Sequence, residues 1–298
     1  MKMLVITGVI IVTLLFSGSQ LEAIPSISID DVGFYLFTPK NPTEGQKLKI
    51  NDTDLLDDSN FNFNWPIRII IHGYESSKDS YINIAIRNEY FKKGNFNVIS
   101  VDWSYYSHTL YPIAMDQVTP VGTFVGELTK FLNRQGASYD KMYLIGHSLG
   151  AHIAGVAGNH ISPELYNTIF ALDPARPGFE GMALERKIDR NDAWYVESIQ
   201  TNTFLFGVGM VEPVGDAAFY PNHLDPIQPG CDEISCSHTR SIDYFVESIN
   251  SDVGFLAKAC SACSEYVRMG GEPSTPKEGI FDLSTNAEPP FARGKYGA

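Results

Sequence analysis

Short apolar runs alternate with polar segments along the chain, a pattern typical of strands buried in a parallel sheet. After the apolar run that ends at Val101, apolar residues recur at helical spacing from Pro120 to Arg134, which predicts a helix there. A closing helix is predicted from Ser241 to Ile249. Beyond Gly270 no period is clear, so we predict irregular structure there. The pattern indicates an α/β fold with a mostly parallel central sheet and helices on both faces. The predicted strands are Pro66 to Ile71, Phe96 to Val101, Met142 to Ile145, Ile169 to Leu172 and Trp194 to Ile199.

The first residues have the pattern of a secretory signal. Lys2 precedes an apolar stretch from Leu4 to Phe16, which is too short to span a bilayer and is followed by small and polar residues. We expect a signal peptide at residues 1–23, cleaved between residues 19 and 23, and a soluble, secreted mature protein. The remaining residues 24–298, in a chain with 44% hydrophobic content, can form one domain around a large core.

The net charge narrows the kinds of surface that the protein can bind. A net charge of -13 argues against binding to nucleic acid or strong adsorption to anionic membranes, and favours neutral or zwitterionic surfaces.

In a secreted protein the four cysteines are candidates for disulfides, and three pairings stay open. Asn51 is an acceptor for N-glycosylation because Thr53 follows two residues later. The cysteines are Cys231, Cys236, Cys260 and Cys263.

The pentapeptide Gly-His-Ser-Leu-Gly at residues 146–150 is the main candidate for chemistry. It joins a predicted strand to a run of small residues, which predicts a strand, a sharp turn and a helix. Such a turn pushes a serine hydroxyl out above a sheet, and the flanking glycines let strand and helix approach closely. Ser148 is therefore a candidate nucleophile. The alternative is a glycine-rich turn without chemistry.

A nucleophilic serine needs an imidazole to take its proton and a carboxylate to orient that imidazole. On this kind of sheet the acid and then the base follow the serine along the chain. Asp173 has the best position because it ends a predicted strand and precedes Pro174, although a turn-capping aspartate is the alternative. Other acids qualify by position alone: Asp189, Asp192, Asp216 and Asp225.

Only two histidines lie late enough in the chain to act as the base. His238 is preferred because it follows Cys236, whose disulfide could hold the loop that presents it. His223, in a loop flanked by proline, remains the alternative. Order along the chain excludes the other five as the base: His72, His108, His147, His152 and His160.

Two backbone N–H groups are needed to stabilise the oxyanion that forms on an ester carbonyl. One is expected from Leu149, the residue after the nucleophile. The other is expected from Tyr74, because Gly73 allows a turn directly after an earlier strand.

Together these residues resemble the pancreatic lipase family of secreted animal lipases, in order and spacing over most of the mature chain. The resemblance implies an α/β-hydrolase fold, hydrolysis of a lipid ester through an acyl-enzyme without an organic cofactor, and the roles given above to Ser148, Asp173, His238, Tyr74 and Leu149. It also implies a structural calcium ion at Asp189 and Asp192. The matching motifs are Ile71 to Tyr74, Val101 to Trp103, Gly146 to His152, Ala171 to Ala175, Phe219 to Asn222, Gln228 to Cys231 and Cys236 to Arg240.

Three departures from the family pattern refine this expectation. The chain is too short for the family's C-terminal β-sandwich, so we expect no colipase-like partner. Only four residues separate Cys231 from Cys236, where the family carries a lid, and the second loop, Thr201 to Gly215, is also compact. This resembles the phospholipase A1 branch, including insect and venom members. The third departure is the tight spacing of Cys260 and Cys263, for which closure on itself is favoured.

The first hypothesis is therefore a secreted phospholipase A1 that cleaves the sn-1 acyl chain of phospholipids. The alternative within the same machinery is a lipase that acts on triacylglycerols or other neutral lipids. An alternative of another class is a lipid-binding or yolk-like protein without catalysis. Such relatives arise by loss of the nucleophile, and Ser148, Asp173 and His238 are all present here.

Overall fold

The computed structural model describes residues 27–203, 207–223, 227–259 and 263–297. The expected signal peptide, the candidate acid Asp225, Cys260 and residues 204–206 of the second loop lie outside these ranges. Within the described ranges, every helix is too short or too polar to cross a membrane.

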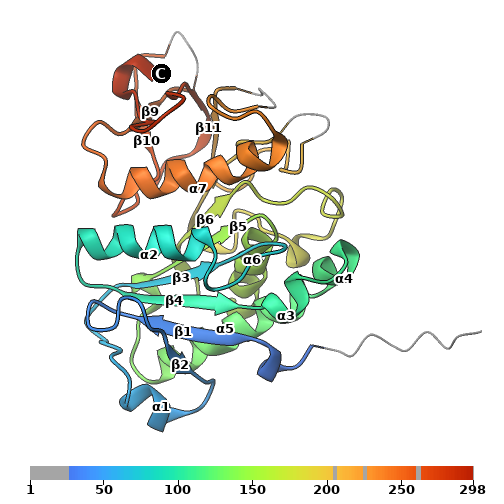
Figure 1. Cartoon of the computed structure of the whole chain (residues 1–298), viewed down its shortest axis with the longest axis vertical. Coiled ribbons are helices and arrows are strands. Elements are labelled where there is room, and N and C mark those ends of the chain that lie inside the picture. The colour runs from blue at the N-terminus through green and yellow to red at the C-terminus, as the bar shows by residue number, and fades with distance from the viewer. Residues whose placement is uncertain (1–26, 204–206, 224–226, 260–262, 298) are drawn as a thin grey trace, which may run out of the picture.

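A nine-stranded sheet forms the centre of the molecule, in the order β11-β8-β7-β6-β5-β3-β4-β1-β2. The seven strands from β11 to β4 run parallel, whereas β1 pairs antiparallel with both β4 and β2 (Figure 1). The bounds are β1 Gly33–Phe37, β2 Gln46–Leu48, β3 Ile67–Ile71, β4 Asn97–Asp102, β5 Met142–His147, β6 Tyr166–Leu172, β7 Ala193–Ile199, β8 Ala217–Pro221 and β11 Gly279–Leu283. A separate antiparallel pair is formed by β9 Phe255–Ala257 and β10 Val267–Met269.

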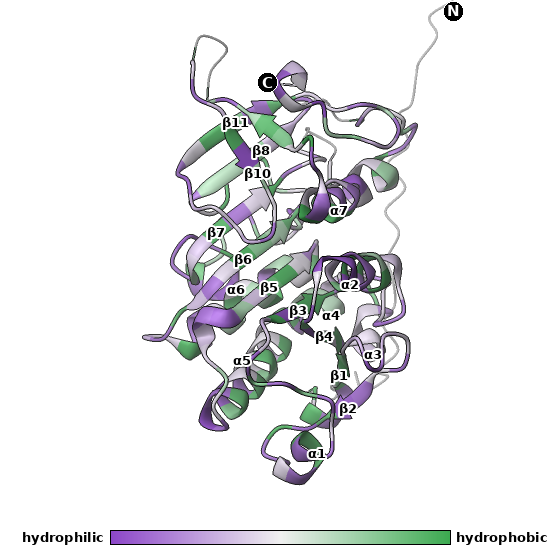
Figure 2. Ribbon diagram, turned by 90° about the vertical axis from the view of Figure 1, so that its left-hand side faces the viewer, coloured by the Kyte–Doolittle hydropathy of each residue, from purple (hydrophilic) through white to green (hydrophobic). Residues whose placement is uncertain are grey.

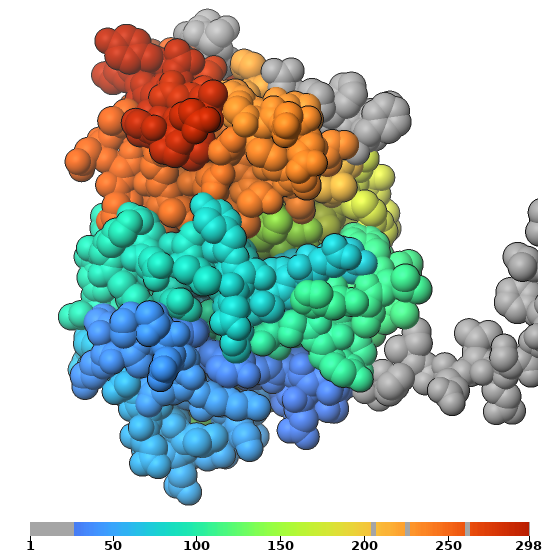
Figure 3. Space-filling model, viewed as in Figure 1, coloured from blue at the N-terminus to red at the C-terminus, as the bar shows by residue number. Residues whose placement is uncertain are grey.

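Helices cover both faces of this sheet. Figure 2 shows α2 Tyr81–Lys93 and α7 Ile234–Asn250 on one side and α5 Val118–Arg134 and α6 Leu149–Ile161 on the other. In Figure 3 the orange atoms of α7 lie directly above the teal atoms of α2 on the first face. The short helices are α1 Thr53–Asp57, α3 Ser104–Ser107 and α4 Tyr111–Asp116.

The apolar strands build two cores, one on each face. In β3, Ile69 and Ile71 join the cluster that contains Val125 of α5, whereas Ile70 joins the cluster that contains Phe245 of α7. Successive side chains of a strand point to opposite faces, so a strand covered on both faces is mostly apolar on both. This explains the continuous apolar runs of the sequence and confirms the α/β prediction.

The five predicted strands and the helix from Pro120 to Arg134 are confirmed, with small shifts at their ends. The closing helix is confirmed too, but it begins at Ile234, not at Ser241. The prediction of irregular structure beyond Gly270 is wrong, because this segment contains an edge strand, β11, parallel to β8. The strand escaped prediction because only alternate residues, Phe281 and Leu283, are buried, within a segment of five residues.

Cys231 and Cys236 form a disulfide, which selects one of the open pairings for these residues. Cys263 is also disulfide-bonded, and the described cysteines include no free thiol. Asn51 is exposed, and its Oδ1 accepts a hydrogen bond from Arg134 Nη2 at 2.7 Å. Glycosylation of Asn51 stays a prediction.

Candidate active site

Ser148 lies in the turn between β5 and α6, in a strained backbone conformation with φ 57°. Its N–H donates to the Leu172 carbonyl at 3.0 Å, at the end of the neighbouring strand β6. A Cβ at Gly150 would lie 2.2 Å from the Ile71 carbonyl oxygen, and one at Gly146 would lie 2.2 Å from the Gly150 oxygen. Both glycines are therefore required for the close approach that the sequence predicts.

Asp173 directly follows β6 and is also strained, with φ 42°. Its side chain is fully buried, and its Oδ1 accepts hydrogen bonds from the N–H groups of Thr201 at 2.8 Å and Asn202 at 3.1 Å. A Cβ at Gly209 would lie 2.4 Å from this oxygen, so the second loop can cover Asp173 only with glycine at that position. Its other oxygen, Oδ2, is left to face a histidine.

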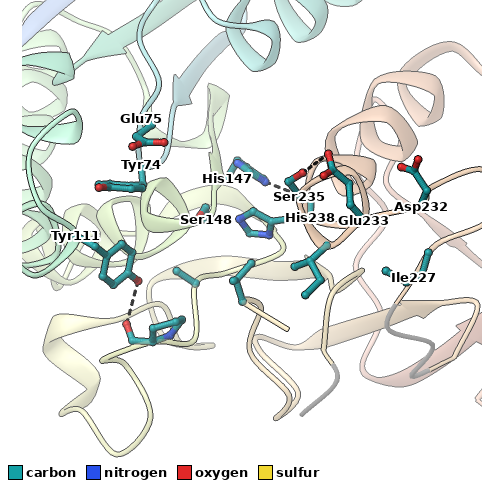
Figure 4. A pocket seen from close by; sticks show the side chains of 14 residues that line it. Tyr74, Glu75, Tyr111, His147, Ser148, Ile227, Asp232, Glu233, Ser235 and His238 are labelled. Carbon is teal, nitrogen blue, oxygen red and sulfur yellow. Dashed lines mark hydrogen bonds between the residues drawn. The ribbon is translucent and has the colours of Figure 1, made fainter. Parts of the chain in front are cut away.

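That histidine is His238, in the second turn of α7. Its Nδ1–H donates to Asp173 Oδ2 at 2.5 Å, and its side chain is 15% exposed. Nε2 is then the basic nitrogen of the ring. Figure 4 shows the ring beside the Ser148 hydroxyl. Within the described residues no hydrogen bond joins the two groups, as in many substrate-free sites where such contacts shorten on binding.

The described alternative acids and the alternative base lie elsewhere. His223 is in an exposed turn, with Nδ1 3.3 Å from Asp282 Oδ1. Asp216 accepts from the Val196 N–H at 2.9 Å and pairs with Arg190. Among the candidates that the structure describes, it therefore brings together one set, Ser148, Asp173 and His238.

The two expected oxyanion donors lie at the same edge of the sheet. Among described residues, neither the Tyr74 N–H nor the Leu149 N–H has a hydrogen-bond acceptor, so both can serve a substrate oxygen. The turn before Tyr74 is held by His72, which accepts from the Trp103 N–H at 3.2 Å and stacks on that indole. The Tyr74 hydroxyl donates to the Thr109 carbonyl at 2.8 Å, which fixes its ring at the site.

A cavity of about 880 Å³ opens over these groups (Figure 4). Its apolar wall suits an acyl chain, and three carboxylates, Glu75, Asp232 and Glu233, lie around it. The complete lining is Tyr74, Glu75, Tyr111, His147, Ser148, Ala175, Pro177, Val208, Ile227, Asp232, Glu233, Ile234, Ser235 and His238.

The disulfide loop does not reach over this cavity as a separate lid. Asp232 and Glu233 are the only residues between Cys231 and the first residue of α7. The described part of the second loop folds back on the acid instead, since the Met210 N–H donates to the Pro174 carbonyl at 2.8 Å.

Sequence reasoning missed two histidines near the site, the half-buried His147 and the buried His152. His147 contacts His238 through its ring and through a hydrogen bond. His152, on α6, donates from Nε2 to the Ala175 carbonyl at 2.7 Å and accepts from the Ile188 N–H at 3.3 Å. Burial lowers the pKa of His152 to about 4, so it is neutral at pH 7. Chain order excludes both as the base, and a supporting role depends on contacts that the sequence does not show.

Asp189 and Asp192, the expected calcium ligands, lie together in one turn. Asp192 Oδ2 accepts from the Asp189 N–H at 2.8 Å, and Asp189 Oδ1 accepts from the Asn191 N–H at 2.7 Å. No cluster of three metal-binding side chains occurs in the described ranges, so these carboxylates alone fall short of the six to eight oxygens that Ca²⁺ takes. Calcium binding stays a prediction, and no step below uses it.

A nucleophile turn on a mostly parallel sheet, followed by an acid at the end of the next strand and a late histidine, defines an α/β hydrolase. Residues 19–279 match the family model described as Lipase. The chain therefore belongs to the lipase family, and its relatives place it with the pancreatic lipases.

Three relatives illustrate this similarity. Pancreatic lipase-related protein 2 of Cavia porcellus is 32% identical over 94% of this chain and 71% of its own length. Pancreatic triacylglycerol lipase of Mus musculus is 33% identical over 88% of this chain and 65% of its own length. Inactive pancreatic lipase-related protein 1 of Mus musculus is 34% identical over 78% of this chain and 54% of its own length. The chain thus spans between 54% and 71% of the length of these relatives. Among solved structures, Est1E from Butyrivibrio proteoclasticus matches 72% of this chain and 93% of its own at 14% identity, with a TM-score of 0.36.

Proposed function

We propose that this protein is a secreted carboxylic ester hydrolase that cleaves lipid esters, with phospholipids as substrates and the sn-1 ester as the bond broken. The observation that carries the proposal is the hydrogen-bonded pair Asp173 and His238 beside Ser148, in a turn that exposes the serine to an apolar cavity. Secretion is supported by the disulfide, because such bonds persist in oxidising compartments.

In the first half of the reaction, His238 Nε2 takes the proton of the Ser148 hydroxyl while Oγ attacks the ester carbonyl carbon. The negative charge that develops on the carbonyl oxygen is stabilised by the N–H groups of Tyr74 and Leu149. The imidazolium is stabilised by Asp173. His238 then gives its proton to the departing glycerol oxygen, which leaves the lysophospholipid free and the acyl group on Ser148.

Water completes the cycle. His238 takes a proton from a water molecule as the water oxygen attacks the acyl carbon, and the same N–H pair stabilises the second oxyanion. The proton returns to Ser148 Oγ as the fatty acid leaves. The enzyme is thus regenerated without an organic cofactor.

The short disulfide loop supports phospholipids as the substrate class. With two residues between Cys231 and α7, the disulfide loop leaves room beside the cavity for a bulky polar head group. The carboxylates of Glu75, Asp232 and Glu233 disfavour an anionic head group and suit a zwitterionic one that carries an ammonium. The choice of the sn-1 ester rests on resemblance to the phospholipase A1 branch.

The test uses phosphatidylcholine with different acyl chains at sn-1 and sn-2, compared with triacylglycerol at equal ester concentration. We expect faster release of the sn-1 acid from phosphatidylcholine, and loss of all release in Ser148→Ala, which keeps the fold. Faster hydrolysis of triacylglycerol would favour the alternative that the name of the mouse triacylglycerol lipase suggests.

A non-catalytic lipid-binding protein is the candidate from another class, since one similar protein of Mus musculus is named inactive. The discriminating measurement is labelling by an organophosphonate that reacts with activated serines. Labelling at Ser148 supports the enzyme. A wild-type protein that binds lipid without labelling or ester cleavage would support the other class.

A further inference from the structure

His147, the residue before the nucleophile, contacts the proposed base through two independent interactions. Its ring centroid lies 4.4 Å from that of His238, with the ring planes tilted by 45°. Its Nε2–H donates to the His238 backbone carbonyl at 3.1 Å. This carbonyl belongs to the second turn of α7 and also accepts from the Ser241 hydroxyl at 3.0 Å. His147 therefore links the last residue of β5 to the turn of α7 that carries the base.

His147 is also placed to stay uncharged. Burial, and then the neighbouring His238, lower its pKa well below the usual value of a histidine. Among the described residues, the charged groups near it are Asp173, which is bonded to the His238 ring, and the cavity carboxylates Glu75, Asp232 and Glu233. A second positive charge at 4.4 Å would oppose the imidazolium that His238 must become during the reaction.

We propose that His147 is a positioning residue that holds the His238 ring against Asp173. This inference rests on the proposed function, because it gives His147 a role only through the base. The contact to the backbone of His238 restrains the helix turn, and the tilted ring limits rotation of the imidazole. Both restraints keep Nδ1 directed at Asp173 Oδ2.

Two substitutions separate these contributions. In His147→Gln the side-chain amide can still donate to the His238 carbonyl but cannot titrate. In His147→Phe the ring packing is retained and the donor is lost. His160→Phe, on the far end of α6, serves as the matched control for replacing a histidine by phenylalanine.

We expect His147→Phe to lower kcat about fivefold to tenfold, as for loss of one hydrogen bond, with KM changed less than about twofold. His147→Gln should retain activity within about threefold of wild type. His160→Phe should behave as wild type. Equal losses in His147→Phe and His147→Gln, or wild-type kcat in His147→Phe, would overturn the inference.

A second readout does not require turnover. The proton NMR signal of the His238 Nδ1–H in the Ser148→Ala background reports its hydrogen bond to Asp173. In His147→Phe this downfield signal should move upfield or broaden by exchange with water, because the bond is held less firmly. A merely structural role would leave the signal unchanged. Absence of ester cleavage in wild type would refute the proposed function, whereas an unchanged Nδ1–H signal would refute the role of His147.

Discussion

The buried histidine on α6 predicts that the protein loses stability in mild acid. His152 is fully buried, and its ring stacks on Phe179 with a centroid distance of 3.8 Å. Its Nε2–H bond to Ala175 ties the cavity wall to α6, and its Nδ1 accepts from the Ile188 N–H. A protonated ring would lose the second bond and would carry a buried charge.

The direction and the size of this loss of stability follow from the lowered pKa of His152. The unfolded chain takes up a proton near pH 6.5, whereas the folded protein does so only near pH 4. The contribution of His152 to stability is therefore complete above pH 6.5 and is lost as the pH falls toward 4. Integrated between these values, the loss at pH 5 is about 2 kcal/mol.

The measurement is urea unfolding of wild type and His152→Gln at pH 7 and pH 5. Glutamine can donate to the Ala175 carbonyl but does not titrate, so carboxylates and the other histidines contribute equally to both proteins. We expect the variant to be less stable than wild type at pH 7, and the difference to shrink by about 2 kcal/mol at pH 5. An equal difference at both pH values would refute the assignment of a neutral His152.

Three further predictions concern the site. Asp173→Asn should lower kcat by about three to four orders of magnitude in a soluble-ester assay, with the fold retained by circular dichroism, because Asn cannot hold the base in the required tautomer. Gly209→Ala should lower kcat and the unfolding midpoint, since its Cβ would meet the Asp173 carboxylate, while Gly94→Ala, with no atom closer than 3.8 Å, should not. Replacing both Asp232 and Glu233 by lysine should raise the affinity for anionic vesicles about tenfold, measured by co-sedimentation at low salt. An unchanged affinity would argue that these carboxylates do not repel anionic head groups at the cavity.

The triad could be predicted because its signals are local. Ser148 and Asp173 each follow a short apolar strand, and the carboxyl ends of parallel strands meet at one edge of the sheet. Order along the chain then left only His223 and His238 as the base. The structure places His238, and not His223, against Asp173 even though α7 begins earlier than predicted, because the disulfide and the helix both hold the segment before His238.

The remaining features of the site could not be predicted, because they depend on backbone groups or on packing between distant segments. The bonds from Thr201 and Asn202 to Asp173 come from N–H groups, which any residue type supplies. Half-buried His147 and buried His152 are distinguished from other histidines only by what they contact. The edge strand β11 has too few apolar residues to show a period, and its pairing with β8 joins segments about 60 residues apart.

The parallel register itself fixes the distance between nucleophile and acid. Ser148 is the first residue after β5, and its N–H donates to the last residue of β6. Asp173 is the first residue after β6, and its N–H donates to Ile199, the last residue of β7, at 2.8 Å. Each strained residue thus continues the sheet by one hydrogen bond before the chain leaves it, so the ladder holds both residues in conformations that would be costly in a loop. His238 lies on helix α7 and not at the end of a strand, so the sheet ladder does not hold it. Additional contacts, such as that from His147, are therefore needed to fix the base.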